Sequence, residues 1–193
     1  MKTLVLATCV FVLGLTSGCG SASEDAASSS AAESVEAAAP IKNFHTVRPG
    51  AVYRGAAPGD KGLGYLKQLG IRTIVDLRIG DYIEESPDDI LHEKSQAAKL
   101  GMAWIHQEMS AFEFPSDAKM NAILDLLADS SKYPIFIHCT HGEDRTGLAI
   151  GLERVLQEGW QPQAAHDEMI KYGFHTFFEG LNHYFEERTG WED

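Results

Sequence analysis

Cysteine is scarce in this chain of 193 residues, which holds only Cys9, Cys19 and Cys139. The first two lie within or just after an apolar N-terminal segment, so a chain processed there would keep Cys139 alone. A single thiol excludes an intramolecular disulfide framework. Because exported proteins usually use cysteines in pairs, a solitary cysteine is better explained by catalysis than by cross-linking.

Positive charge is also in short supply. The chain has 16 Lys and Arg residues against 28 Asp and Glu, and its net charge is −12 at pH 7. Such a surface repels nucleic acid and anionic lipid headgroups, so neither is an expected partner. It also disfavours a strongly anionic substrate unless local positive charge overcomes the field of the whole protein. We expect a monomer that acts on a small molecule.

The N-terminus combines a basic start with an apolar stretch, residues 4–15, that is too short to span a bilayer as a permanent helix. This pattern is typical of an export signal. Residues 15–19, Leu-Thr-Ser-Gly-Cys, resemble a bacterial lipobox, although the leucine lies four residues before Cys19 instead of three. The chain is therefore predicted to be exported, either as a membrane-anchored lipoprotein or as a soluble periplasmic protein after ordinary cleavage nearby.

The next segment, residues 20–40, is rich in Ser, Ala and Glu, contains no aromatic residue and ends at Pro40. It cannot bury enough apolar surface to fold and is predicted to be a flexible tether. The remaining residues, 41–193, suffice for one domain of ordinary size. The predicted organisation is a signal with a lipobox-like end (1–19), a tether (20–40) and one functional domain (41–193).

The most informative motif is His-Cys-Thr-His-Gly-Glu-Asp-Arg-Thr-Gly at residues 138–147. An apolar run behind a proline, residues 133–137, precedes it and predicts a buried strand. Residues 146–158 follow with apolar side chains at helical spacing. Cys139 is therefore expected where a strand ends, and Arg145 where a helix begins.

This arrangement is suited to holding a phosphate. Backbone N–H groups of a tight loop and of a helix N-terminus form an anion-binding concavity. Gly142 allows close approach of the backbone, and Arg145 can donate two hydrogen bonds to phosphate oxygens. The same field favours a thiolate at Cys139, and Thr146 can hydrogen-bond its sulfur. The predicted phosphate-binding residues of the loop are Thr140, His141, Gly142, Glu143, Asp144 and Arg145.

The pattern HCxxGxxRTG resembles the signature loop of the cysteine-dependent protein tyrosine and dual-specificity phosphatases. Residues 47–55, 66–70 and 71–78 further resemble the compact atypical dual-specificity group, and the resemblance runs from residue 44 to the C-terminus. That group includes enzymes acting on inositol polyphosphates and pyrophosphates, and bacterial phosphatases related to cysteine-type phytases. The resemblance implies phosphate-ester hydrolysis through a phosphocysteine at Cys139, without metal or cofactor.

The loop has three alternative interpretations. A lone cysteine is most often a small buried hydrophobic residue, but the accompanying Gly142, Arg145 and Thr146 argue against this. A rhodanese-type sulfurtransferase also holds a cysteine in a cradle, whereas Arg-Thr-Gly at the helix start favours phosphoryl transfer. A catalytically silent phosphate-binding module is the remaining alternative, because the general acid is not evident.

Strand and helix patterns alternate along the domain. Residues 71–77 and 102–106 read as strands; helices are expected over 88–100, after Ser116, from Pro162 to Tyr172 and over 175–188. The prediction is an α/β protein with a tyrosine-phosphatase-like fold, a mostly parallel central sheet and helices on both faces. Ligands bind beyond the carboxyl ends of such strands. Arg78 is expected there, either on a second phosphate or in a surface ion pair with Asp76 or Asp81.

The general acid is the hardest assignment, because cleavage of the ester needs a proton for the leaving oxygen. Relatives mostly use an aspartate on a loop before the nucleophile strand, and residues 108–117 offer none at the expected place. Asp144 is the first candidate and Glu113 the second. The alternative for Asp144 is a carboxylate that only stabilises the loop.

In the family the histidine equivalent to His138 is structural. His138 with His141 lacks a third metal ligand at suitable spacing, so no metal is predicted.

The substrate is predicted from the resemblance and from the charge of the loop. Relatives that act on phosphoinositides often carry lysine at the position of Glu143, so this loop is less positive than theirs, which disfavours a polyanionic substrate. The likeness to the inositol-phosphate group points the other way. We favour an inositol polyphosphate over phosphotyrosine, which stays the alternative.

Overall fold

The computed structural model describes residues 36–37, 39–80 and 85–191. The predicted export signal and lipobox, and most of the predicted tether, lie outside these residues. No helix within the described ranges is long and apolar enough to cross a membrane.

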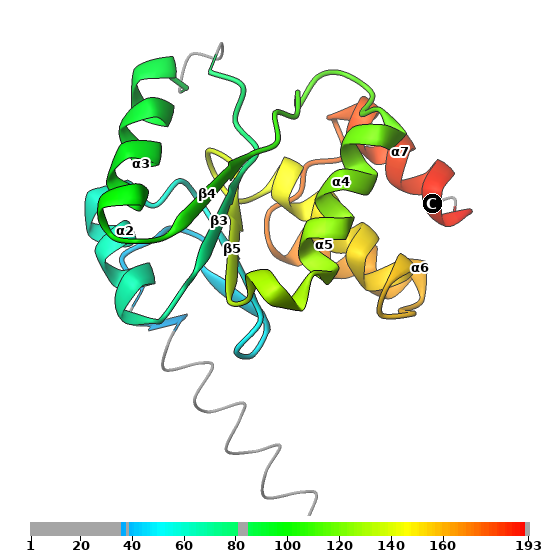
Figure 1. Cartoon of the computed structure of the whole chain (residues 1–193). Helices are drawn as coiled ribbons and strands as arrows, with labels where there is room; N and C mark the ends of the chain where they lie inside the picture. Colours follow the sequence, from blue (N-terminus) through cyan, green and yellow to red (C-terminus); the bar gives the residue numbers. More distant parts are fainter. Residues whose placement is uncertain (1–35, 38, 81–84, 192–193) are drawn as a thin grey trace, which may run out of the picture.

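A five-stranded sheet forms the centre of the domain (Figure 1). Its strands lie in the order β1-β2-β5-β3-β4, and all neighbours are parallel except β1 and β2. Their bounds are His45–Arg48 for β1, Val52–Gly55 for β2, Thr73–Asp76 for β3, Ala103–His106 for β4 and Ile135–His138 for β5. His138 is in register with Gly55 on one side and with Asp76 on the other. The chain segments that follow β2, β5 and β3 therefore leave the sheet side by side.

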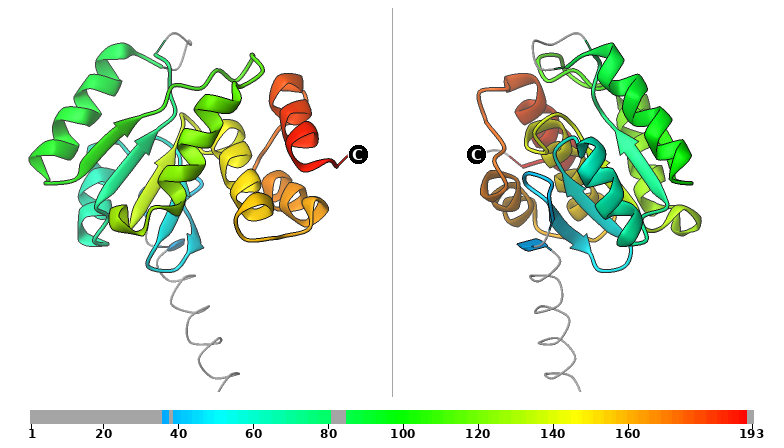
Figure 2. Two further views of the ribbon diagram at one scale, coloured as in Figure 1. Left: turned by 45° about the vertical axis from the view of Figure 1, so that its right-hand side comes forward. Right: turned by 90° about the vertical axis from the view of Figure 1, so that its left-hand side faces the viewer.

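Helices cover both faces of the sheet, as predicted (Figures 1 and 2). The two on one face are α2, Gly59–Gln68, and α3, Pro87–Lys99. Those on the other are α4, Asp117–Ala128, α5, Asp144–Leu156, α6, Pro162–Lys171, and α7, Glu179–Thr189. Each face has its own apolar core: one includes Leu63, Leu66 and Phe136, and the other Ile137, Leu148 and Phe185. Burial of these side chains stabilises the sheet from both sides.

Helix α5 is the central helix of the second layer, and every residue from Asp144 to Arg154 is buried. Gly151 lets α6 approach closely, because a Cβ atom there would collide with the sulfur of Met169. The helix that follows the motif is thus held rigidly by packing on its sides. Its N-terminal turn, which carries Arg145, is fixed accordingly.

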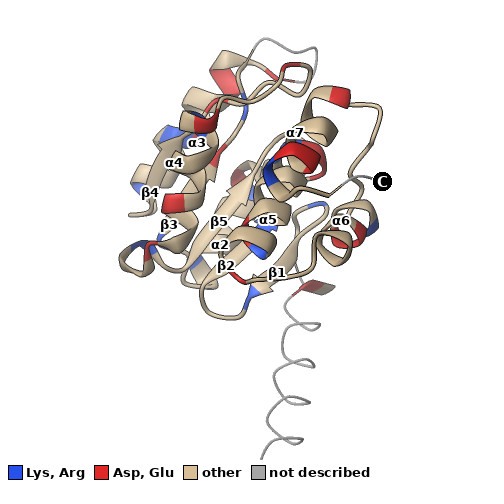
Figure 3. Cartoon of the chain, turned by 90° about the vertical axis from the view of Figure 1, so that its right-hand side faces the viewer, with Lys and Arg blue, Asp and Glu red and all other residues tan. Residues whose placement is uncertain are grey.

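One residue of the predicted tether, Glu36, contacts the start of β1. The side chain of Glu36, which belongs to the predicted tether, accepts a 2.6 Å hydrogen bond from the backbone N–H of Thr46 and lies 3.0 Å from Nδ1 of His45. The side chain of Glu36 therefore contacts the first strand of the domain, and the predicted bounds of the domain stay a prediction. Figure 3 shows acidic and basic residues interspersed over α6 and α7, without a continuous basic face in that view.

Candidate active site

The loop between β5 and α5 has the strand-to-helix geometry that the motif predicts. β5 ends at His138 and α5 begins at Asp144, so Cys139 lies at the strand end and Arg145 in the first helical turn. Gly142 has a positive φ of 73°, and a Cβ atom there would collide with the backbone of Gly55 at the end of β2. Only glycine permits this turn and this close approach.

Cys139 is buried, with 2% of its surface exposed. Burial alone would raise the pKa of its thiol, but the Arg145 guanidinium, the Thr146 hydroxyl and backbone N–H groups of Thr146 and Gly142 together lower it below the ordinary value. The Thr146 hydroxyl is buried and has no hydrogen-bond partner among the described residues, and it acts on the pKa of the neighbouring sulfur. A thiolate held in this way is a nucleophile near neutral pH.

Arg145 is held by Glu85, a residue that no pattern in the sequence indicated. Its Nη2 forms an ion pair with the buried carboxylate of Glu85 and lies 3.1 Å from Oγ1 of Thr140, which also donates to Glu85. The other carboxylate oxygen of Glu85 accepts from the N–H groups of Ile79, at 3.1 Å, and Gly80, at 3.3 Å. Although burial opposes it, the Arg145 contact lowers the pKa of Glu85. Glu85 therefore fixes Arg145 and neutralises its charge.

Arg78 does not lie open at the rim of the site. Its side chain is 6% exposed and donates to Asp76 at 2.7 Å and to Glu93 of α3 at 2.7 Å. The guanidinium is thus used within the protein and is not presented to a second phosphate. The alternative of an ion pair with Asp76 describes it better, although the pair is buried and not at the surface.

Glu93 joins this pair to the residue before the nucleophile. One of its carboxylate oxygens lies 2.9 Å from Nε2 of His138 and 3.1 Å from Nε1 of Trp104, which donates to it. Nδ1 of His138 lies 3.1 Å from the carbonyl oxygen of Cys139. With both ring nitrogens protonated, His138 donates to Glu93 and to the Cys139 carbonyl. His138 therefore belongs to a buried hydrogen-bond network that orients the first peptide of the loop, which is the structural role that the resemblance implies for it.

The two candidates for the general acid lie in different surroundings. Oδ1 of Asp144 accepts hydrogen bonds from the backbone N–H of His175, at 2.8 Å, and lies 3.0 Å from its ring Nδ1. Burial raises the pKa of Asp144 above its ordinary value, although His175 opposes the shift. Glu113 is exposed and lines a shallow pocket with Phe114 and Lys119. A raised pKa suits an acid that must hold a proton, so the geometry favours Asp144 while also giving it a loop-stabilising contact.

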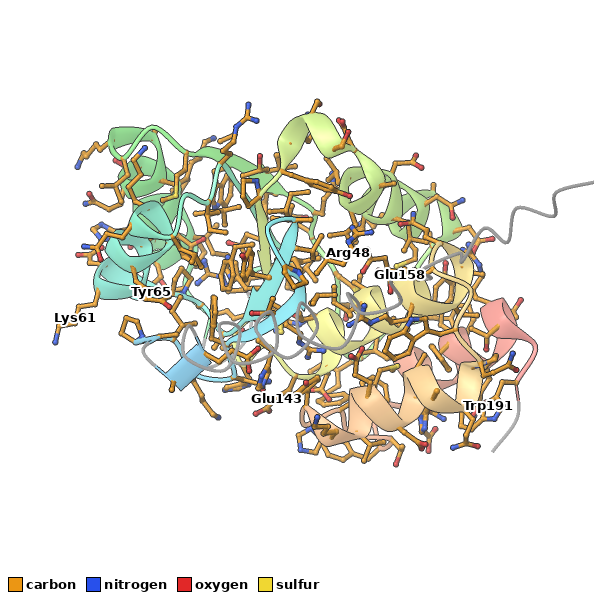
Figure 4. All side chains as sticks on the ribbon, turned by 90° about the horizontal axis from the view of Figure 1, so that it is seen from below. Arg48, Lys61, Tyr65, Glu143, Glu158 and Trp191 are labelled. Carbon is orange, nitrogen blue, oxygen red and sulfur yellow. The ribbon has the colours of Figure 1, made fainter. Side chains whose placement is uncertain are left out.

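The remaining predicted loop residues are distributed around the cradle. His141 is half-buried. The carboxylate of Glu143 pairs with Lys42 at 3.5 Å, on the underside of the molecule where Figure 4 labels it. A Cβ atom at Gly173 would lie 2.8 Å from its Cγ. The Glu143 side chain therefore packs against neighbouring segments, and only its backbone can contribute to the cradle.

Comparison with known proteins agrees with this geometry. A family model described as the tyrosine phosphatase family matches residues 38–187. The chain belongs to this family. It is 30% identical over 143 residues to the dual specificity protein phosphatase TpbA of Pseudomonas aeruginosa, covering 72% of this chain and 58% of that protein. It is 31% identical over 119 residues to the inositol diphosphatase DSP3 of Arabidopsis thaliana, covering 62% and 57%. The chain thus spans somewhat more than half the length of these relatives.

Solved structures of phosphatases share the fold. The crystal structure of P. aeruginosa TpbA superposes with a TM-score of 0.62 at 25% identity, covering 76% of this chain and 84% of that one. The catalytic core of the S. cerevisiae PP-IP phosphatase SIW14, in complex with citrate, gives 0.62 at 26% identity, covering 78% and 90%. The predicted tyrosine-phosphatase-like fold is confirmed.

Two groups near the site bring potential metal ligands within 4.8 Å of one another: Asp76, Glu93 and His138, and Glu143, Asp144 and His175. In the first group Arg78 and His138 already neutralise both carboxylates. In the second, Lys42 and His175 occupy them. Catalysis without metal stays a prediction.

The buried network predicts a pH-dependent effect of Glu93→Gln on stability. Burial alone would lower the pKa of His138, but Glu93 and Asp76 raise it to about 9. The imidazolium therefore stabilises the fold fully below about pH 6.5, and this contribution is lost as the pH rises towards 9. The difference in free energy of unfolding between wild type and Glu93→Gln, from denaturant titrations, should shrink by on the order of 2 kcal/mol over this range.

The matched control for that experiment is Trp104→Phe. It removes a neutral hydrogen bond to the same carboxylate but leaves the charge beside His138 in place, so its destabilisation should be nearly independent of pH. A Glu93→Gln difference that stays constant between pH 6 and pH 9 would show that His138 is not held as an imidazolium.

Proposed function

We propose that the chain hydrolyses phosphate monoesters through a phosphocysteine at Cys139. The observation that carries the proposal is a buried thiol at the start of a tight loop that turns at Gly142 and closes at Arg145 in the first turn of α5. The thiolate forms an S–P bond as the P–O bond to the leaving group breaks, and Asp144 gives its proton to the leaving oxygen. Water then cleaves the S–P bond, returning a proton to Asp144 and releasing inorganic phosphate.

Two measurements on the full chain test this function. Phosphate release from a panel of monoesters, measured with a chelator present, should be observed and should be insensitive to the chelator. Rapid acid quenching during turnover should add the mass of one phosphoryl group to the peptide that contains Cys139. Binding of phosphate without release from any ester would instead identify a silent phosphate-binding module.

The side chains beside the cradle support an aromatic phosphate ester, such as phosphotyrosine, as the substrate. Phe112 and Phe177 are 71% and 69% exposed. Phe178 joins them, with ring centroids 5.3 Å from Phe112 and 4.4 Å from Phe177. His175, which binds Asp144, lies 5.1 Å from Phe177. The cluster reaches the loop through the contact of His175 with Asp144, and we propose that a flat leaving group packs against it.

The expected inositol polyphosphate finds less support among the side chains, and we keep it as the second candidate. Arg78 and Arg145 are paired with carboxylates, and Lys42 with Glu143. A ring bearing several phosphates would need free cations at the rim. What favours it is the likeness to inositol diphosphatases of plants.

The aromatic cluster leads to a prediction about specificity. The double substitution Phe112→Ala and Phe177→Ala should raise KM for a phosphotyrosine peptide about tenfold, because each aromatic contact is worth about 0.5–1.5 kcal/mol. It should leave kcat/KM for inositol hexakisphosphate within about twofold. Steady-state phosphate release on both substrates measures the effect. Leu91→Ala, at a side chain of α3 that is 60% exposed, is the control and should change neither value. An equal loss on both substrates would contradict a role in recognition.

Export and anchoring through Cys19 belong to the same proposal. Residues 1–19 support them by pattern alone. Fractionation of cells that produce the wild type and Cys19→Ala tests both: the wild type should sediment with membranes and the variant should not. A phosphatase outside the cytoplasm would act on small or extracellular phosphate esters.

A further inference from the structure

Arg54, at the third position of β2, is the most deeply buried arginine near the site, with 1% of its surface exposed. Its Nη2 donates to the carbonyl oxygen of Gly142 at 2.6 Å and lies 3.5 Å from that of Glu143. Its guanidinium carbon lies 5.2 Å from the centre of the Tyr172 ring. Nε has no hydrogen-bond partner. Arg54 therefore sits directly against the catalytic loop and is held by neutral groups.

The other buried or half-buried arginines of the described ranges each pair with a carboxylate. Arg78 pairs with Asp76, and Arg145 with Glu85. Arg154 pairs with Glu168 at 3.0 Å. Arg48 pairs with Glu153 at 2.8 Å and with Glu158 at 3.5 Å; Figure 4 labels Arg48 and Glu158. Arg54 makes no such pair with any described residue.

An isolated buried charge is costly unless an opposite charge lies close to it. Other charged groups around the loop have partners of opposite sign: Glu85 pairs with Arg145, and Lys42 with Glu143. Burial lowers the pKa of Arg54 to about 10, and the strongest influence that opposes this shift is attraction to Cys139. Glu168 and Tyr172 act in the same direction and Arg154 against it, but Glu168 is already paired with Arg154. Because the guanidinium donates to the Gly142 carbonyl, an anion held in the loop is the nearest remaining complement to Arg54.

We infer that Arg54 is a positioning residue. Its positive charge favours the thiolate form of Cys139 and offsets the negative charge of a phosphoryl group held in the loop. Arg145 acts on Cys139 and the substrate directly but is also paired with Glu85, so Arg54 adds a second positive charge against the loop. The hydrogen bond to the Gly142 carbonyl has a second effect. In a trans peptide the N–H of Glu143 points opposite to that carbonyl, so the bond turns this donor away from Arg54.

The rate at which iodoacetamide alkylates Cys139, followed by peptide mass as a function of pH, tests this inference. Arg54→Met removes the charge at similar length. It should slow alkylation at pH 6 about tenfold relative to wild type, because less thiolate is present. Arg54→Lys should stay within about threefold of wild type. The matched control is Asn43→Gly, because Asn43 also donates to the Gly142 carbonyl, at 2.9 Å, but carries no charge. It should leave the alkylation profile unchanged.

Two results would overturn the inference. One is a folded Arg54→Met protein with the alkylation profile of the wild type. The other is an equal loss in Asn43→Gly, which would reduce the role of Arg54 to bracing the loop. Should Arg54→Met fail to fold, Arg54→Lys decides, since a folded lysine variant with a tenfold loss excludes charge as the cause. The inference rests on the proposed chemistry of Cys139, but alkylation needs no turnover, so its failure is distinguishable from failure of the phosphatase proposal.

Discussion

Cys139→Ser should abolish turnover while leaving phosphate binding nearly intact. The thiol is held as a nucleophile by a lowered pKa, whereas a serine hydroxyl at the same place stays protonated at neutral pH. Phosphate release should fall more than about 10³-fold, as is usual when a nucleophile is removed. The backbone N–H groups of the loop and Arg145 are unchanged, so inorganic phosphate should bind within severalfold of the wild-type affinity by calorimetry.

Cys19→Ser is the control for this experiment, because it removes a thiol of the chain that lies outside the described domain. Its turnover should equal that of the wild type. If Cys139→Ser turned over phosphate esters at the wild-type rate, the phosphocysteine mechanism would be refuted. The pH dependence adds a second test: kcat/KM should rise as Cys139 ionises, on an acid limb below the ordinary pKa of a thiol.

The catalytic loop could be predicted because its information is contiguous. Residues 138–147 contain the strand end, the tight turn, the nucleophile and the helix start, so no long-range contact is needed to recognise it. The flanking apolar patterns then place β5 and α5. The same holds for α4, where Ser116 caps the helix by accepting from the N–H of Lys119 as expected.

The partners of the loop could not be predicted, because packing alone brings them together. Glu85 is 60 positions from Arg145, and Glu93 is 45 positions from His138. For Arg78 the position could be predicted, but the partner of its side chain could not. Its position after a parallel strand predicts a side chain at the rim of the site, but the guanidinium donates to Glu93 of α3 instead. Which carboxylate an arginine meets depends on how a helix lies over the sheet, and no spacing in the sequence encodes that.

Helix α2 was missed for a different reason. It contains Gly62 and Gly64 and begins without a side-chain cap, so its intrinsic propensity is low. Tertiary packing outweighs this, because a Cβ atom at Gly62 would lie only 2.8 Å from Ile41 and from Pro58. The glycine is needed for the helix to approach the segment before β1. Close contact across the chain thus produces a helix that local preference disfavours.

Asp144→Asn should reveal the general acid through the dependence of its effect on the leaving group. For an alkyl phosphate, whose leaving oxygen must be protonated, kcat should fall about 100-fold or more. For p-nitrophenyl phosphate, whose leaving group is stable as an anion, the loss should be at most about fivefold. Burial raises the pKa of Asp144, so the wild-type rate on the alkyl ester should decline as the pH rises through that pKa. This alkaline limb should be absent from the variant.

The controls separate catalysis from loop stabilisation, the two roles that the contact between Asp144 and His175 allows. His175→Ala removes the ring partner but keeps the carboxylate, so the leaving-group dependence should persist and kcat should change only severalfold. Glu113→Gln should leave both substrates unaffected. Equal losses of Asp144→Asn on both substrates would assign the carboxylate to loop stabilisation. A leaving-group effect in Glu113→Gln would transfer the role of acid to the exposed loop beside the aromatic cluster.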